Sequence, residues 1–178
     1  MRTGQQLERF ERLFLPHMPA AYNLARWLLG NSQDADDVVQ EAYLRAFRAF
    51  ARFSGTNHRG WLLRIVRNTA YTWLRDHRDR NVIPFDEVLH GAASELEPFD
   101  ATEDAQANRN LVHDAIAELP LAFREVIVLR ELEELSYKEI ASAINAPIGT
   151  VMSRLARGRR QLSEILIARR RAESHGEL

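Results

Sequence analysis

Apolar residues recur every three or four positions over two long stretches of this chain, residues 7–80 and 109–166. This spacing places the apolar side chains on one face of an α-helix, whereas a half-buried strand would alternate apolar with polar residues. Nowhere does the sequence show such an alternation. We therefore expect an all-α fold, in which each stretch forms one small helical domain by packing the apolar faces of its helices together.

The segment that separates the two stretches, residues 81–108, has no sustained periodicity. It contains Pro84 and Pro98, seven acidic residues and no Lys or Arg. Such a composition buries too little apolar surface to offset the entropy of ordering the chain, so it predicts a flexible acidic linker. The expected organisation is a first domain at residues 1–80, then the linker, then a second domain at residues 109–178.

The charge of the chain is unevenly distributed, although its 24 basic and 25 acidic residues give a net charge of −1. Residues 1–80 hold 13 basic against 8 acidic side chains, and residues 150–171 hold seven Arg against Glu164 alone. All of the basic residues are Arg except Lys138. Two Arg-bearing domains on either side of an acidic linker suit a polyanionic partner such as nucleic acid, which the net charge alone would not suggest.

Several classes of protein are disfavoured by what the sequence lacks. It has no Cys, which excludes a disulfide scaffold and a Cys-ligated zinc site, and its six His residues are dispersed without metal-binding spacing. No nucleophile elbow, glycine-rich phosphate loop or dinucleotide fingerprint occurs, so we expect no enzyme and no cofactor. No apolar run reaches the roughly 18 to 20 residues of a membrane span. The first 15 residues interleave Arg and Glu with apolar residues, so we expect a cytoplasmic protein without membrane insertion.

A cap and a cluster of acidic residues begin the helix expected at about residues 32–53. A Gly-Asn-Ser sequence ends the preceding helix and caps this one, where the helix dipole favours acidic side chains. The outer face carries Asp36, Asp37, Gln40 and Glu41, followed by Arg45 and Arg48. Neighbouring helix positions point about 100° apart, which disfavours acid/base pairs at Asp36 and Asp37 or at Glu133 and Glu134. The face is therefore either solvated or a surface that binds another protein.

A loop and a third helix of about 20 residues follow. The loop is indicated by the sequence Ser-Gly-Thr-Asn at residues 54–57. One stripe of the helix is apolar and includes Trp61 and Trp73, which we expect in the core. The opposite stripe presents polar side chains to solvent: Arg64, Arg67, Asn68, Tyr71, Arg75 and Arg78. Within this stripe, Tyr71 is the aromatic residue that we expect to be exposed.

A helix-turn-helix is indicated in the last third of the chain. Ser136 and Glu139 form a capping box at the start of a short helix. Asn145 occupies the turn, where a left-handed backbone conformation is common and Asn adopts it more readily than most residues. The second helix, from Thr150 to about Leu166, has these exposed positions: Met152, Ser153, Arg154, Ala156, Arg157, Arg159 and Arg160. An ordinary helical hairpin with a solvated Arg face also fits this spacing.

Three blocks of sequence together resemble the extracytoplasmic function (ECF) group of bacterial sigma-70-type factors. Residues 34–43, DADDVVQEAY, resemble region 2.2 of that group, and residues 61–69, WLLRIVRNT, are similar to region 2.3–2.4. Residues 119–155 look like region 4, because they run from Leu-Pro through FREV and LSYKEIA to GTVMSRL. The resemblance covers about residues 8–80 and 109–168. It implies an initiation factor that binds core RNA polymerase and confers promoter choice, with no chemistry of its own.

The resemblance also implies a role for each polar face. The face at Asp36, Asp37, Gln40 and Glu41 would bind the clamp helices of the largest RNA polymerase subunit. A set around the third helix would open and hold the −10 element of promoter DNA: Ser54, Gly55, Thr56, Asn57, His58, Arg64, Arg67, Asn68, Tyr71, Arg75 and Arg78. A set in the helix-turn-helix would bind the −35 element: Lys138, Thr150, Met152, Ser153, Arg154, Arg157, Arg159 and Arg160.

Some details stay open at this point. Met152 departs from the Lys or Arg that is common in the family at its position, and either Arg154 or Arg157 would be the residue that reaches a base. An anti-sigma factor is a further partner that the resemblance implies. The alternative function is that of a stand-alone helix-turn-helix transcriptional regulator, which would bind duplex DNA without polymerase.

Overall fold

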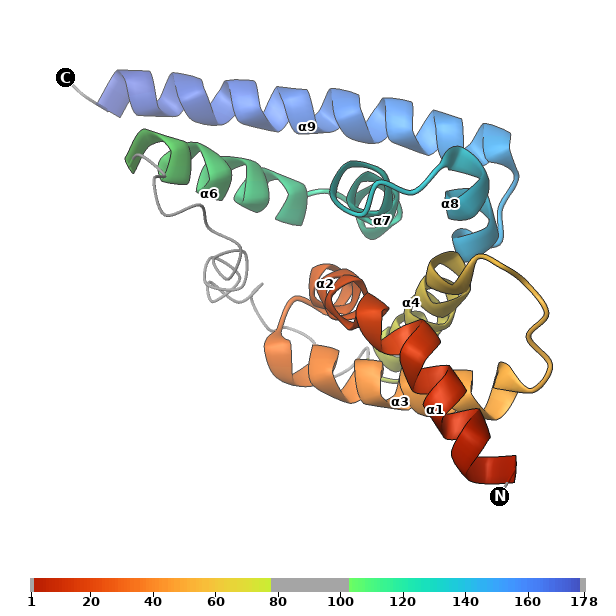
Figure 1. Ribbon diagram of the computed structural model, residues 1–178. Helices are drawn as coiled ribbons and strands as arrows, with labels where there is room; N and C mark the ends of the chain where they lie inside the picture. The colour runs from red at the N-terminus through yellow and green to blue at the C-terminus, as the bar shows by residue number, and fades with distance from the viewer. Residues whose placement is uncertain (1, 78–102, 177–178) are drawn as a thin grey trace.

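Figure 1 shows the computed structural model, which describes residues 2–77 and 103–176. Every regular element in these two ranges is a helix, as the apolar spacing predicts. Most of the predicted acidic linker, and Arg78 from the −10 set, lie outside the described residues. Within the described ranges, no helix is long and apolar enough to cross a membrane.

The first half of the chain folds into a group of packed helices, with the cap that the sequence predicts before its third long helix. Its elements are α1 (Arg2–Phe14), the 3-10 turn η1 (Leu15–His17), α2 (Met18–Leu29), α3 (Ser32–Phe50) and α4 (His58–Asp76). The chain breaks at η1 because Pro16 has no amide hydrogen to continue the α-helix. Gly30 then adopts a left-handed conformation with φ of 83°. The side chain of Asn31 accepts a hydrogen bond from the amide of Asp34 at 2.8 Å, which begins α3.

Aromatic rings from α1, α3 and α4 form the centre of this half. The ring of Phe14 is fully buried and lies 4.8 Å from that of Phe10, 5.7 Å from that of Phe50 and 5.3 Å from that of Trp61, measured between centroids. The hydroxyl of Tyr43 donates to the carbonyl oxygen of Phe14 at 2.8 Å, and burial raises the pKa of Tyr43 to about 12. These contacts fix α4, which carries the predicted −10 residues, against α1 and α3.

The second half is also helical, and two of its boundaries differ from those predicted. Its elements are α6 (Glu103–Ala117), α7 (Leu121–Ile127), the π-helical turn η4 (Val128–Leu132), α8 (Tyr137–Ile144) and α9 (Ile148–Gly176). Residues 103–108, which composition assigns to the linker, begin α6, because acidic residues and alanines favour the first turns of a helix. Helix α9 continues past Leu166, where Arg169 forms ion pairs with Asp114 of α6 and with Glu118, which directly follows α6.

The helix-turn-helix is present as α8 and α9. Ser136 and Glu139 form the predicted capping box, and Asn145 ends α8 in the left-handed conformation with φ of 53° and ψ of 51°. Helix α9 packs tightly on α7 at Gly158, a position that helical spacing does not single out. A Cβ added there would lie 3.2 Å from Cγ1 of Ile127, so a larger residue would fit only if the Ile127 side chain shifted by a few tenths of an ångström.

Replacing Asn145 by Ala is expected to lower the free energy of unfolding by about 1 kcal/mol, because Ala is strained in the left-handed conformation. Asn145→Gly should cause no loss, since Gly adopts that conformation freely. Gly149→Ala is a matched control at an open position in the first turn of α9. Urea unfolding of the three variants measures the difference, and an Asn145→Ala protein as stable as the unmodified chain would contradict the prediction.

The two halves pack against each other, with α7 and α8 lying on α2 and α4 (Figure 1). Their buried apolar side chains form one continuous cluster. The ring of Trp27 in α2 lies 4.3 Å from that of His113 in α6, and Arg124 of α7 donates to the carbonyl oxygen of Trp27 at 3.1 Å. The two predicted domains are therefore in direct contact.

Candidate DNA and polymerase interfaces

The polar stripe of α4 is present, but only part of it faces solvent. Arg64, Asn68 and Arg75 are exposed and lie along one face of the helix. Trp61 and Trp73 pack partly buried against the core, as expected. The exposed face thus offers two guanidinium groups and an amide, which are groups that bind phosphates and base edges.

Arg67 and Tyr71, from the same stripe, are turned toward α7. Arg67 donates to both carboxylate oxygens of Glu125, from Nε at 2.9 Å and from Nη2 at 3.2 Å. Its guanidinium lies 4.0 Å from the centroid of the Tyr71 ring. Burial, together with the negative charge of Glu125, raises the pKa of Tyr71. The prediction that Tyr71 is exposed is wrong, because α7 packs over this end of the stripe and half-buries the ring.

The loop before α4 is exposed at Ser54, Gly55 and Thr56, as predicted. Asn57 has two roles that the sequence did not reveal. Its Oδ1 accepts from the amide of Gly60 at 2.8 Å, which caps α4, and its Nδ2 donates to Glu139 of α8 at 3.0 Å. The amide of Asn57 is therefore engaged rather than free for a base.

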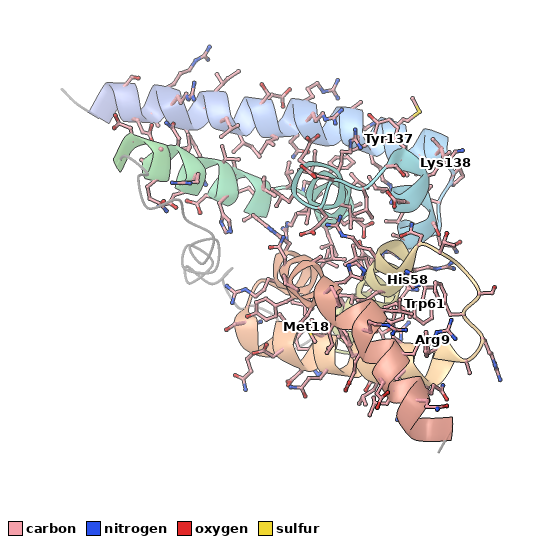
Figure 2. All side chains as sticks on the ribbon, in the orientation of Figure 1. Arg9, Met18, His58, Trp61, Tyr137 and Lys138 are labelled. Atoms are coloured by element: carbon pink, nitrogen blue, oxygen red, sulfur yellow. The ribbon has the colours of Figure 1, made fainter. Side chains whose placement is uncertain are left out.

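His58 is partly buried, as Arg67 and Tyr71 of the −10 set are. Its ring lies 5.7 Å from that of Phe14 and 5.5 Å from that of Phe53, between centroids. Figure 2 shows His58 and Trp61 together at the start of α4, beside α1. His58 therefore contributes to the aromatic cluster and presents only part of its ring to solvent.

The recognition helix α9 has a free surface of the composition predicted for the −35 set. Met152 is 52% exposed, Ser153, Arg157 and Arg160 are also exposed, and Thr150 is partly exposed. Lys138 is exposed on α8 and lies near the start of α9 in Figure 2. This surface can neutralise phosphates and reach base edges in a major groove.

Two other arginines of the −35 set are held by carboxylates. Nη1 of Arg154 lies 3.7 Å from Glu125, the same residue that binds Arg67. Arg159 donates to Glu131 of η4 from Nε at 2.9 Å and from Nη2 at 2.6 Å, and this hydrogen bond raises the pKa of Arg159. Arg157 is exposed and forms no such pair within the described residues. Of Arg154 and Arg157, the two candidates for the base contact, Arg157 is therefore the one that faces solvent.

The acidic face of α3 is exposed as predicted. Asp36, Asp37 and Gln40 are exposed and form no hydrogen bond or ion pair with other described residues. Glu41 accepts from Nε of Arg45 one turn later at 2.7 Å, and this hydrogen bond lowers the pKa of Glu41. Three of the four side chains are thus available to a protein partner.

A groove of about 1640 Å³ runs along α1, α2 and α3 and reaches η4. Exposed apolar side chains line it: Leu7, Leu15, Met18 (labelled in Figure 2), Leu44 and Leu132. Asp36 and Gln40 line the same groove. Any molecule that fills the groove therefore also covers part of the acidic face.

Two buried carboxylates in the second half were not identified from the sequence as site residues. Glu125 is fully buried and Glu133 is 6% exposed, and both contact side chains of the first half. The sequence contains one signal for Glu125, which lies directly before the apolar run Val126 to Leu129 and is therefore a candidate for burial. A carboxylate in the core needs a cationic partner, so this position predicts a contact with an Arg or Lys.

Comparison with known families matches both halves of the chain. The model of Sigma-70 region 2 matches residues 13–80, and the model of Sigma-70 region 4 matches residues 109–162. The first match ends just after α4, and the second covers α7, η4, α8 and the recognition part of α9. The two matches follow one another in the order in which the regions are numbered.

Curated relatives match most of the chain. It is 34% identical over 171 residues to the ECF RNA polymerase sigma factor SigE of Mycolicibacterium smegmatis, with 92% of this chain covered but only 65% of that relative. It is 33% identical over 165 residues to the RNA polymerase sigma-H factor of Pseudomonas aeruginosa, with 88% and 86% covered. It is 38% identical over 136 residues to the ECF RNA polymerase sigma-E factor of Escherichia coli, with 72% and 71% covered.

Two solved structures have the same fold. One is the sigma factor RpoE in complex with the anti-sigma factor NepR from Bartonella quintana, with a TM-score of 0.71, 25% identity and coverage of 89% of this chain and 97% of that chain. The other is CnrH in complex with the cytosolic domain of CnrY, with a TM-score of 0.64, 25% identity and coverage of 91% and 90%.

Proposed function

The chain belongs to the sigma-70 family, and on this premise we propose that it is an ECF sigma factor that binds core RNA polymerase and directs promoter-specific transcription initiation. One observation carries the proposal. Regions 2 and 4 coincide with the two helical halves; the first half presents exposed Arg, amide and hydroxyl groups, and the second presents exposed Arg and hydroxyl groups. The factor selects promoters and is not an enzyme. It acts in the cytoplasm, where the polymerase meets DNA.

We assign region 2 to residues 1–80, the acidic linker to residues 81–108 and region 4 to residues 109–178. Region 2 binds the −10 element through the loop at residues 54–57 and the exposed face of α4. An exposed loop with hydroxyl and amide groups suits an extruded base, and arginines next to it suit the phosphates of the strand. On this face Arg64 and the amide of Asn68 are exposed, and Arg75 is exposed although its Nε donates to the neighbouring Asp76 at 3.3 Å.

Region 4 binds the −35 element by placing the start of α9 in the major groove, as the second helix of a helix-turn-helix does. Arg157 is the residue best placed to contact a base, because it is exposed and forms no ion pair with other described residues. Arg160 and Lys138 contact phosphates from either side of it. Met152 supplies an apolar surface where an arginine or lysine would add a charge.

The acidic face of α3 binds core polymerase, and an anti-sigma factor competes for it. The competing partner is supported by the relative that was solved with an anti-sigma factor. The apolar groove beside α3 has the character of a site for an amphipathic helix. Since Asp36 and Gln40 line this groove, a partner bound in it would exclude the polymerase from the same residues.

Transcript sequencing with purified core polymerase tests the proposal. Core plus this protein should make transcripts whose start sites share −10 and −35 sequences, and core alone should make none of them. A stand-alone regulator would instead bind duplex DNA without core and leave core inactive. That second result would favour the alternative function.

A further inference from the structure

Arg26 of α2 is a buried cation without an anionic partner among the described residues. It is 3% exposed and is one of the residues that line the apolar groove beside α3. Its polar contacts are with Tyr22 alone in this part of the chain: Nη1 donates to the Tyr22 hydroxyl at 3.5 Å, and the guanidinium lies 5.9 Å from the ring centroid. Nε and Nη2 have no hydrogen-bond partner within the described ranges. Since a buried charge without a partner costs free energy, Arg26 requires an explanation.

The carboxylates that line the groove with Arg26 do not pair with it. Glu133 is buried, but its Oε1 accepts from Asn23 and its Oε2 accepts from Arg59. Glu11 and Asp36 are exposed and form no hydrogen bond with Arg26. The positive charge of Arg26 is therefore not neutralised by the described part of the chain.

The two unpaired nitrogens of Arg26 are a pair that can hold a carboxylate. Nε and Nη2 lie on one edge of the guanidinium, and their parallel N–H groups match the two oxygens of a carboxylate. Arg67 uses the same two nitrogens to donate to both oxygens of Glu125 in this protein. Arg26 thus has an unused edge for a carboxylate that comes from outside the described chain.

The rest of the groove determines what kind of molecule carries that carboxylate. A volume of about 1640 Å³, lined by the exposed side chains of Leu7, Leu15 and Leu44, suits the apolar face of a bound helix better than a small anion. Glu11 and Asp36 would also repel a free anion. On a helix, by contrast, the same two carboxylates would attract Lys or Arg side chains that flank the apolar face.

We propose that Arg26 is the binding site for one Asp or Glu side chain of an amphipathic helix that occupies the groove. The carboxylate replaces the contact with Tyr22, which at 3.5 Å is at the limit of a hydrogen bond. The free protein carries the cost of the buried charge, and binding of the helix offsets it. In the proposed function the helix belongs to the anti-sigma factor. That identification rests on the proposed function, whereas the carboxylate contact does not.

A display library of amphipathic helices is the probe, with Asp, Glu, Asn and Gln all allowed at each groove-facing position. Helices selected on the purified chain should share an Asp or Glu at one fixed position of the apolar face. Exchanging that residue for its amide, or Arg26→Met in the protein, should each weaken binding at least about 30-fold. Both changes together should weaken it no more than either one alone, because they remove the same contact.

Arg12→Met is the matched control, because Arg12 is an exposed arginine of α1 that does not line the groove. It should change the affinity for the selected helices by less than about twofold. Additive losses in the double variant, selected helices without a fixed acidic position, or no selected helix at all would overturn the proposal.

Urea unfolding separates this binding role from a structural one. Arg26→Met should unfold at the same urea concentration as the unmodified chain or at a higher one, because it removes an unpaired charge from a buried position. A lower midpoint would show that Arg26 stabilises the fold, and would overturn the proposal. Neither measurement contains polymerase or promoter DNA, so its failure is distinguishable from a failure of the proposed function in transcript sequencing.

Discussion

Exchanging Asp36 and Asp37 for arginine is expected to weaken binding to core RNA polymerase by about 100-fold or more. Both carboxylates are exposed on α3 and unpaired among the described residues, so they are available to a basic surface of the polymerase. Reversing their charge replaces attraction by repulsion at the interface, which costs more than removing the charge. The fold should be unaffected, because neither side chain contributes to the core. Fluorescence anisotropy of labelled protein titrated with core polymerase measures the affinity.

Glu173→Arg provides the control for this change. Glu173 is exposed on α9 beyond the region 4 match, so its reversal alters the net charge without touching α3. Its affinity for core should stay within about twofold of the unmodified chain. Tight binding by the doubly reversed protein would move the polymerase contact away from the acidic face of α3 and would contradict this assignment.

The local structure was predicted well from the sequence because it depends on neighbouring residues. The helix end and cap at Gly30 and Asn31, the left-handed Asn145, and the capping box of Ser136 and Glu139 are all confirmed. Each is determined by side-chain or backbone chemistry within one helical turn. The buried side of α3, with Val38, Val39 and Phe50, likewise follows from helical spacing alone.

The contact between the two halves could not be predicted in the same way. The exposure of Arg67 and Tyr71 depends on Glu125, which lies 58 residues beyond Arg67 in the chain. Helical spacing places a side chain on the polar stripe of its own helix, but it does not report that another helix covers part of that stripe. The same limit applies to Arg154, which spacing assigns to a free Arg face and the structure places beside a buried carboxylate.

Arg124 is the clearest example of a long-range role that spacing does not reveal. Its guanidinium donates to three backbone carbonyl oxygens: those of Trp27 at 3.1 Å, Ala117 at 2.7 Å and Leu119 at 2.9 Å. The first belongs to α2 and the other two lie at and just beyond the end of α6, so one side chain satisfies carbonyls near two helix ends. Burial lowers the pKa of Arg124, as expected for a cation that gains carbonyl oxygens rather than a carboxylate.

Replacing Arg124 by Met is expected to lower the free energy of unfolding by about 3 kcal/mol or more, because three carbonyl oxygens lose a charged donor and Met can donate to none of them. Arg130→Met is the comparison within the same segment. Arg130 donates to a single carbonyl oxygen, that of Leu135 at 2.8 Å, so its loss should cost only about 1 kcal/mol. Urea unfolding followed by circular dichroism measures both. Equal losses in the two variants would mean that the carbonyls near Arg124 are satisfied by water once it is removed, and that Arg124 does not stabilise the contact between the two regions.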